Sequence, residues 1–149
     1  MEVKEYKIES EQGLKAIALE LAPKLKTGDV VVLNGTLGAG KTTFARYLIN
    51  ILAGEEVEVP SPTFTLVQEY ELPNISIWHF DLYRLEEKET DILELGWEEA
   101  RRYGVALVEW PDRLGNLLPK EHIEINIEFI KDNPDSWRYI CYKNNKSQI

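Results

Sequence analysis

Residues 29–42 read Asp29-Val-Val-Val-Leu-Asn34 and then Gly35-Thr-Leu-Gly-Ala-Gly-Lys-Thr42, and this stretch decides the fold. The first part is a β-branched run without polar alternation, which predicts a strand buried on both faces. After the glycine-rich part, apolar residues at helical spacing predict an amphipathic helix that ends near Gly54: Phe44, Leu48, Ile51 and Leu52. A buried strand, a glycine-rich turn and a helix in this order are typical of a phosphate-binding unit.

The turn itself matches the pattern G-x-x-x-x-G-K-[ST] in full. Its glycines let successive N–H groups point inward, and the helix that begins near Gly40 adds its positive dipole end. Lys41 supplies a charge for the outer phosphates, and the Thr42 hydroxyl is placed for a bridging Mg²⁺. A random chain of this length matches the pattern only about once in two hundred. The motif therefore predicts nucleotide binding, with Thr43 either an ordinary helix residue or a contact to the α-phosphate.

Two acidic residues stand near the ends of apolar runs. Glu109 directly follows Val105-Ala-Leu-Val108, and Asp81 lies within Ile75–Leu82. The metal of such a site lies outside the carboxyl ends of the strands, so one acid would hold Mg²⁺ while the other orients or deprotonates the attacking water. The residues alone leave this division open. They also leave open that either acid caps a turn or lies on a solvated rim.

Three further features have both a functional and a structural interpretation. The turn Ser61-Pro-Thr-Phe64 either offers hydroxyls to the γ-phosphate or its metal, or is a proline-fixed turn capped by Ser61. Trp110 is either a lid over the site or a core residue. Arg84 either stabilises transferred charge or pairs with surface acids.

The remaining elements flank this centre. Ser10 predicts the N-cap of a helix that Pro23 ends or kinks. Further along the chain we expect an antiparallel hairpin, a helical stretch split or weakened at Gly96, and two last strands: residues 64–72 with 75–82, 88–103, 122–130 and 136–142. These elements predict one α/β domain over residues 1–149, a three-layer P-loop NTPase-like fold with a mixed sheet, and a frayed tail at 143–149.

Composition narrows the classes of function. The chain of 149 residues carries a net charge of −9, so its surface repels a phosphate backbone, and we expect no tight direct binding of nucleic acid. The run Val30–Leu33 is far shorter than the ~20 residues of a membrane span, and Met1–Glu5 shows no secretory signal.

Cys141 is the one cysteine, which excludes an internal disulfide and fits a reducing cytoplasm. His79 and His122 are the only histidines, which argues against a multi-histidine metal centre.

Four segments in order resemble the signatures of the TsaE (YjeE) family of small bacterial ATPases that act in tRNA threonylcarbamoyladenosine synthesis. They are Gly35–Phe44, Ser61–Val67, His79–Arg84 and Val108–Pro111. The resemblance runs from about Glu11 to Ile140. It departs at position 36, where this chain has Thr and the family often has Asp. It is also loose around Trp137-Arg138, so Arg138 is left out of the expected site.

The resemblance implies a cytoplasmic ATPase that uses ATP and Mg²⁺ and acts with partners that resemble TsaB and TsaD. We expect slow turnover without those partners, because the sequence shows no obvious arginine finger of its own. TsaD transfers the threonylcarbamoyl group to adenosine 37 of tRNA. The implied catalytic residues are Lys41, Asp81 and Glu109, and the implied metal ligands are Thr42 and Glu109. The implied nucleotide-binding residues are Gly38, Ala39, Gly40, Lys41, Thr42, Thr43, Thr63, Glu11 and Trp110, with Glu11 near the base.

Two other functions use the same phosphate-binding turn. One is a small-molecule or nucleoside kinase, although 149 residues leave no segment for an arginine-bearing lid or an acceptor pocket beyond the hairpin. The other is a non-catalytic module that senses a nucleotide and switches partner binding without cleaving it.

Overall fold

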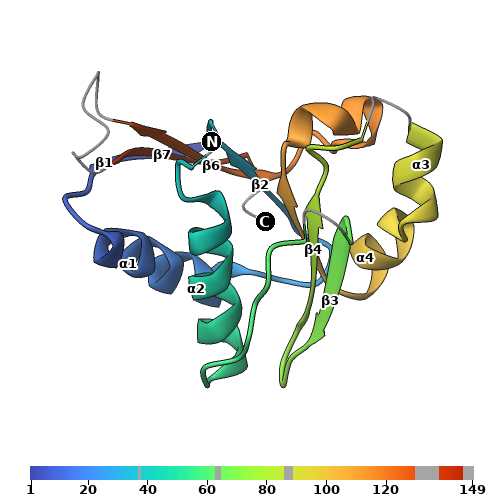
Figure 1. Cartoon of the computed structure of the whole chain (residues 1–149), viewed down its shortest axis with the longest axis horizontal. Helices are drawn as coiled ribbons and strands as arrows, with labels where there is room; N and C mark the ends of the chain where they lie inside the picture. Colours follow the sequence, from blue (N-terminus) through green and yellow to red (C-terminus); the bar gives the residue numbers. More distant parts are fainter. Residues whose placement is uncertain (37, 63–64, 86–88, 130–137, 146–149) are drawn as a thin grey trace.

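The structure is a computed structural model that describes residues 1–36, 38–62, 65–85, 89–129 and 138–145 (Figure 1). Its centre is a sheet of seven strands in the order β1-β7-β6-β2-β5-β4-β3. The strands are β1 (Glu2–Lys7), β2 (Val30–Asn34), β3 (Val67–Glu71), β4 (Ser76–Asp81), β5 (Val105–Glu109), β6 (Ile123–Phe129) and β7 (Arg138–Asn144). The α-helices are α1 (Glu11–Leu21), α2 (Lys41–Ala53), α3 (Glu89–Glu94) and α4 (Trp97–Tyr103). Two 3₁₀ helices, η1 (Ala22–Lys24) and η2 (Pro111–Leu117), complete the described elements.

The sheet is mixed. Its middle strands β6, β2, β5 and β4 run parallel, whereas β3 pairs with β4, and β7 with both β6 and β1, in antiparallel fashion. The predicted hairpin is therefore confirmed as β3 and β4. The expected mixed α/β architecture is confirmed as well.

Helices cover both faces of the sheet, and β2 shows why. Val31 and Leu33 belong to a core shared with Phe44 and the other buried residues of α1 and α2. Val30 and Val32 face the second core, which includes Trp97 of α4. Both faces of this apolar strand are thus buried, as the absence of alternation predicted. Figure 1 shows the two helical layers, with α1 and α2 on one side and α3 and α4 on the other.

Three details differ from the predictions or refine them. Strand β1 is an edge strand that the sequence did not predict, because its charged residues lie on both faces and leave no alternation of apolar and polar positions. The helical stretch is divided at Gly96, whose φ of 95° ends α3 and begins α4. We expect a frayed tail from Lys143, but β7 continues to Asn144, which pairs with Glu2 of β1. Residues 146–149 lie outside the described part. None of the described helices has the length and apolarity to cross a membrane.

Candidate nucleotide-binding site

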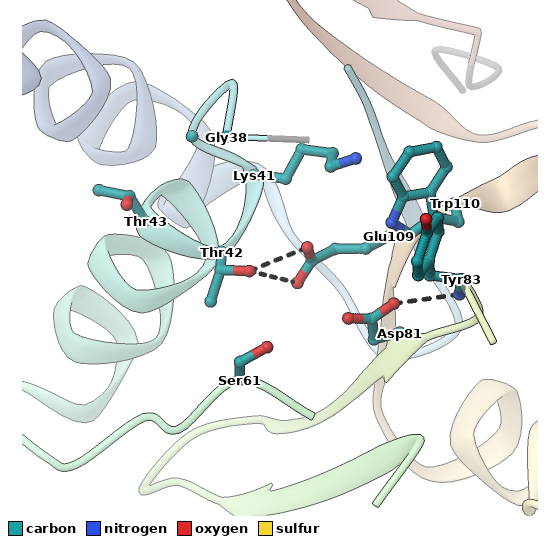
Figure 2. A pocket seen from close by; sticks show the side chains of 10 residues that line it. Gly38, Lys41, Thr42, Thr43, Ser61, Asp81, Tyr83, Glu109 and Trp110 are labelled. Atoms are coloured by element: carbon teal, nitrogen blue, oxygen red, sulfur yellow. Dashed lines mark hydrogen bonds between the residues drawn. The ribbon is translucent and has the colours of Figure 1, made fainter. Parts of the chain in front are cut away.

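The candidate site lies where three parallel strands end beside the start of α2. Register places Asp81 of β4 opposite Glu109 of β5, and Leu33 of β2 opposite the same Glu109. Parallel strands end at one edge, so the acids meet the turn that leads into α2. The side chains surround a cavity of about 370 Å³, shown in Figure 2. It is lined by Gly38, Gly40, Lys41, Thr42, Thr43, Ser61, Asp81, Tyr83, Glu109 and Trp110.

The turn between β2 and α2 is built on glycine. Gly40 is the N-cap of α2 and adopts φ 117°, a left-handed conformation that a residue with a Cβ takes only at a cost. The Gly40 carbonyl accepts the first helical bond, from the Phe44 N–H at 2.9 Å. The first N–H groups of an α-helix have no partner within it, and the helix dipole favours an anion there. This end of α2 opens on the cavity.

Thr42 and Glu109 join α2 to β5. The Thr42 hydroxyl lies 2.9 Å from Oε1 and 3.1 Å from Oε2 of Glu109, so it donates to that carboxylate (Figure 2). On its other side, Glu109 Oε2 lies 2.7 Å from Nε2 of His79. Glu109 is 2% exposed, and its carboxylate is held from two elements.

Lys41 is buried at the edge of the cavity. Its Nζ donates to the Gly35 carbonyl at 2.5 Å and lies 3.4 Å from the centre of the Trp110 ring, a cation–π contact. Burial lowers the Lys41 pKa, while the charges of Glu109, Asp81 and Asp112 oppose that shift. The Gly35 carbonyl and the face of the Trp110 ring therefore hold the Lys41 ammonium group next to the turn.

Aromatic residues close the other side of the cavity. Trp110 has φ 61° and ψ 56°, an uncommon backbone conformation for a non-glycine residue. Its ring lies 4.8 Å from that of Tyr83, centre to centre. The Tyr83 N–H in turn donates to Oδ1 of Asp81 at 3.1 Å. The turns after β4 and β5 thus support one another at the cavity.

Arg138, which sequence reasoning left out, contacts the turn between β2 and α2. Its Nε donates to the Ala39 carbonyl at 2.9 Å and its Nη2 to the Gly38 carbonyl at 3.3 Å. The guanidinium lies 3.9 Å from the centre of the Phe129 ring, and burial lowers the Arg138 pKa. No spacing in the sequence relates β7 to this turn, because antiparallel pairing with β6 brings them together.

The structure brings most of the expected site residues to the cavity. These are Gly38, Gly40, Lys41, Thr42, Thr43, Asp81, Glu109 and Trp110, with Ser61 beside them. Ala39 belongs to the core under the turn and does not line the cavity. Glu11, at the start of α1, does not line it either; it faces Tyr47, whose pKa is raised by burial and by this carboxylate. Thr63 lies outside the described residues.

Two further residues at the site were missed by sequence reasoning. Tyr83 lines the cavity, and its place two residues after Asp81 was a usable signal. His79 contacts Glu109 and lies two residues before Asp81, which puts both side chains on one face of the strand. Neither residue type points to this chemistry by itself.

The donors at the cavity fit a nucleotide with Mg²⁺. Mg²⁺ prefers oxygen ligands and takes one or two from protein carboxylates and the others from phosphates and water, and the Thr42–Glu109 pair supplies such oxygens. Within the described ranges, no three His, Cys, Asp or Glu residues cluster as a complete metal cage. The oxygens of Thr42 and Glu109 therefore fit part of the coordination shell that Mg²⁺ prefers.

Comparison with known proteins gives a consistent result. The family described as "Threonylcarbamoyl adenosine biosynthesis protein TsaE" matches residues 8–138. A tRNA threonylcarbamoyladenosine biosynthesis protein TsaE from Rickettsia conorii is 44% identical over 128 residues, which cover 86% of this chain and 73% of the relative. The protein of the same name from Bacillus subtilis is 41% identical over 120 residues, covering 80% and 73%.

A solved structure is similar as well. The crystal structure of YdiB from Bacillus subtilis superimposes with a TM-score of 0.77 at 32% identity. The match covers 97% of this chain and 86% of that one, so it includes the sheet and the helices on both of its faces.

Proposed function

Because the chain belongs to the TsaE family of tRNA threonylcarbamoyladenosine biosynthesis, we propose that it is a Mg²⁺-dependent ATPase that supports this modification of adenosine 37. The observation that carries the proposal is the contact of the Thr42 hydroxyl with both oxygens of Glu109, beside Lys41. In P-loop nucleotide hydrolases the metal is held by the threonine or serine of the turn together with an acid at a strand end.

Each residue has a distinct role in this proposal. The N–H groups of residues 38–43 and the Lys41 ammonium bind the phosphates. Thr42 and Glu109 hold Mg²⁺, which neutralises charge on the phosphates when it is bound. The contact between Thr42 and Glu109 supports Glu109 as the metal-holding acid. Asp81, its neighbour across β4 and β5, then orients or deprotonates the attacking water.

We also propose that turnover is slow until protein partners bind. The described residues that line the cavity include no arginine to stabilise charge on the transferred phosphoryl group. Partners resembling TsaB and TsaD would complete or reset the site, in the cytoplasm where tRNA is modified. The hydrolysis of ATP would then drive a step of the assembly rather than act on tRNA directly.

Incubation with γ-labelled ATP and Mg²⁺ separates the candidate activities. Release of free labelled phosphate, lost in Asp81→Ala and Glu109→Gln, is the result expected of an ATPase. Label on an added nucleoside or small-molecule acceptor would indicate a kinase instead. A sensing module would bind ATP without cleaving it, and its partner binding would survive both substitutions while Lys41→Ala abolished it.

The role of partners has its own assay. Phosphate release is measured with the chain alone, with TsaB and TsaD added, and with either partner alone. We expect stimulation by the complete set and retention of the chain on it in the presence of ATP. Equal rates in all mixtures, with no retention, would contradict the partner proposal and leave the ATPase proposal standing.

A further inference from the structure

His79 is a buried ring that has no part in the roles given above. It is 0% exposed and lies on β4, two residues before Asp81. Its Nε2 is 2.7 Å from Oε2 of Glu109. Its other nitrogen, Nδ1, is buried and has no hydrogen-bond partner in the part of the chain that the structure describes. An ordinary core histidine satisfies both nitrogens, so this arrangement calls for an explanation.

The partners of the ring decide where its proton sits. An ionised carboxylate only accepts hydrogen bonds, so Nε2 carries a proton and donates a hydrogen bond to Glu109. Nδ1 is buried and meets no hydrogen-bond partner among the described residues, so Nε2 makes the one hydrogen bond found there for the ring. The ring therefore directs an N–H group at the Glu109 carboxylate from β4.

Sheet geometry fixes the direction of this contact. Side chains two apart on a strand share a face, so His79 and Asp81 point to the α2 side together with Glu109 on the neighbouring strand. Register pairs Asp81 with Glu109 and His79 with Leu107, which puts His79 diagonally behind Glu109. Thr42 reaches the same carboxylate from α2, as Figure 2 shows. The carboxylate is thus held between a rigid strand and the helix.

We propose that His79 is a positioning residue for the metal site, whose Nε2–H holds the Glu109 carboxylate facing Thr42. The inference rests on the proposed function, in which Glu109 holds Mg²⁺. The contact from β4 keeps Glu109 in place independently of Thr42. Hydrogen bonds of this kind to a metal-ligating group typically change metal affinity by about 10- to 100-fold when they are removed.

The test compares His79→Leu, which removes the donor, with His79→Gln, whose amide N–H reaches the ε position. Affinity for the ATP analogue AMPPNP is first measured by calorimetry in EDTA. The affinity of the protein–AMPPNP complex for Mn²⁺ is then measured by its electron paramagnetic resonance spectrum. Thermal unfolding is recorded for every variant, and His79→Asn, whose amide ends at the δ position, replaces His79→Leu if the latter does not fold.

We expect His79→Leu to bind AMPPNP in EDTA as the unmodified chain does and to bind Mn²⁺ about 10-fold more weakly. His79→Gln should restore Mn²⁺ affinity to within about twofold of the unmodified chain, because it returns a donor to the same oxygen. The inference is overturned if Mn²⁺ affinity is unchanged in folded His79→Leu, or if the Gln and Leu variants are impaired equally. A parallel loss of AMPPNP affinity in EDTA would also overturn it, because the ring would then support the fold of the site.

Glu109→Gln, measured in the same way, separates this inference from the proposed function. If that substitution leaves Mn²⁺ affinity unchanged, the assignment of the metal to Glu109 fails and the role of His79 fails with it. If Glu109→Gln weakens Mn²⁺ binding and His79→Leu does not, the metal assignment stands and only the role of His79 is wrong.

Discussion

At the scale of single residues, the site is built from side chains that contact one another. Lys41 donates to the turn that it follows, Thr42 donates to Glu109, and Trp110 covers the lysine. Packing and hydrogen bonds therefore hold these side chains in place. Such preorganisation lowers the entropy that binding would otherwise cost.

Replacing Lys41 by alanine should weaken ATP binding. Charge-assisted hydrogen bonds contribute about 1.5–3 kcal/mol, so we expect affinity to fall about 10- to 100-fold in calorimetry. Lys15→Ala is a matched control, because Lys15 is an exposed lysine of α1 that does not line the cavity. Unchanged affinity in Lys41→Ala would remove the phosphate-binding role from this turn.

Trp110 offers a test of backbone strain beside the site. A non-glycine residue in the left-handed region costs about 1–2 kcal/mol, and the Trp110 φ of 61° lies there. Both Trp110→Gly and Trp110→Ala remove the ring from Lys41, but only glycine relieves the backbone. We expect the free energy of unfolding of Trp110→Gly to exceed that of Trp110→Ala by about 1 kcal/mol in denaturant titrations. An alanine variant that is equally stable would show that the turn relaxes.

At the scale of elements, β7 supports the turn between β2 and α2 from a distant part of the sequence. Arg138 binds the carbonyls of Gly38 and Ala39, on the turn that leads into α2. A single planar guanidinium can bind two carbonyls at once, which an ammonium group does less well. The C-terminal strands thus help to define the shape of the turn.

Substitution of Arg138 by methionine should destabilise the chain and weaken the site together. Two carbonyls lose a charged donor, so we expect the free energy of unfolding to fall by about 2 kcal/mol and ATP affinity to fall with it. Arg46→Met, on an exposed position of α2, is the control for loss of an arginine. If Arg138→Met has the same free energy of unfolding and the same ATP affinity as the unmodified chain, β7 has no part in the site.

Elements differ in how far the sequence predicts them. The strand at 30–34, the helix after it and the strand that ends at Glu109 follow from local patterns, because buried apolar runs and glycine positions act over a few residues. Strand β1 has no such pattern. Its hydrogen bonds to β7 hold it in the sheet, and that pairing cannot be seen in its own residues. Likewise, nothing local predicts that Arg138 reaches the turn or that His79 reaches Glu109, because both contacts depend on strand order and register.

At the scale of the whole molecule, charge constrains what the chain binds. The net charge of −9 disfavours the binding of a large polyanion, while the cavity offers Lys41 and the start of α2 to a small anion. A nucleotide can therefore bind locally, whereas tRNA would meet repulsion over a broad area. This agrees with a role carried out through protein partners.

Direct binding of tRNA by the chain alone should be undetectable. Nonspecific binding at physiological salt reaches dissociation constants of 10⁻⁴–10⁻⁶ M for proteins with basic surfaces, so we expect no retention at about 10 µM protein in filter binding. Adding TsaB and TsaD provides the positive comparison. Retention by this chain alone, weakened by salt, would mean that a basic surface exists despite the overall charge.

The central claim is that the turn between β2 and α2 binds ATP together with Mg²⁺. Its most direct test is a crystal structure of the chain grown with AMPPNP and Mg²⁺. We predict phosphates against residues 38–43, the Lys41 ammonium on the outer phosphates, and the cation between Thr42 and Glu109. Electron density for the nucleotide at another place, with this turn empty under saturating ligand, would contradict the claim.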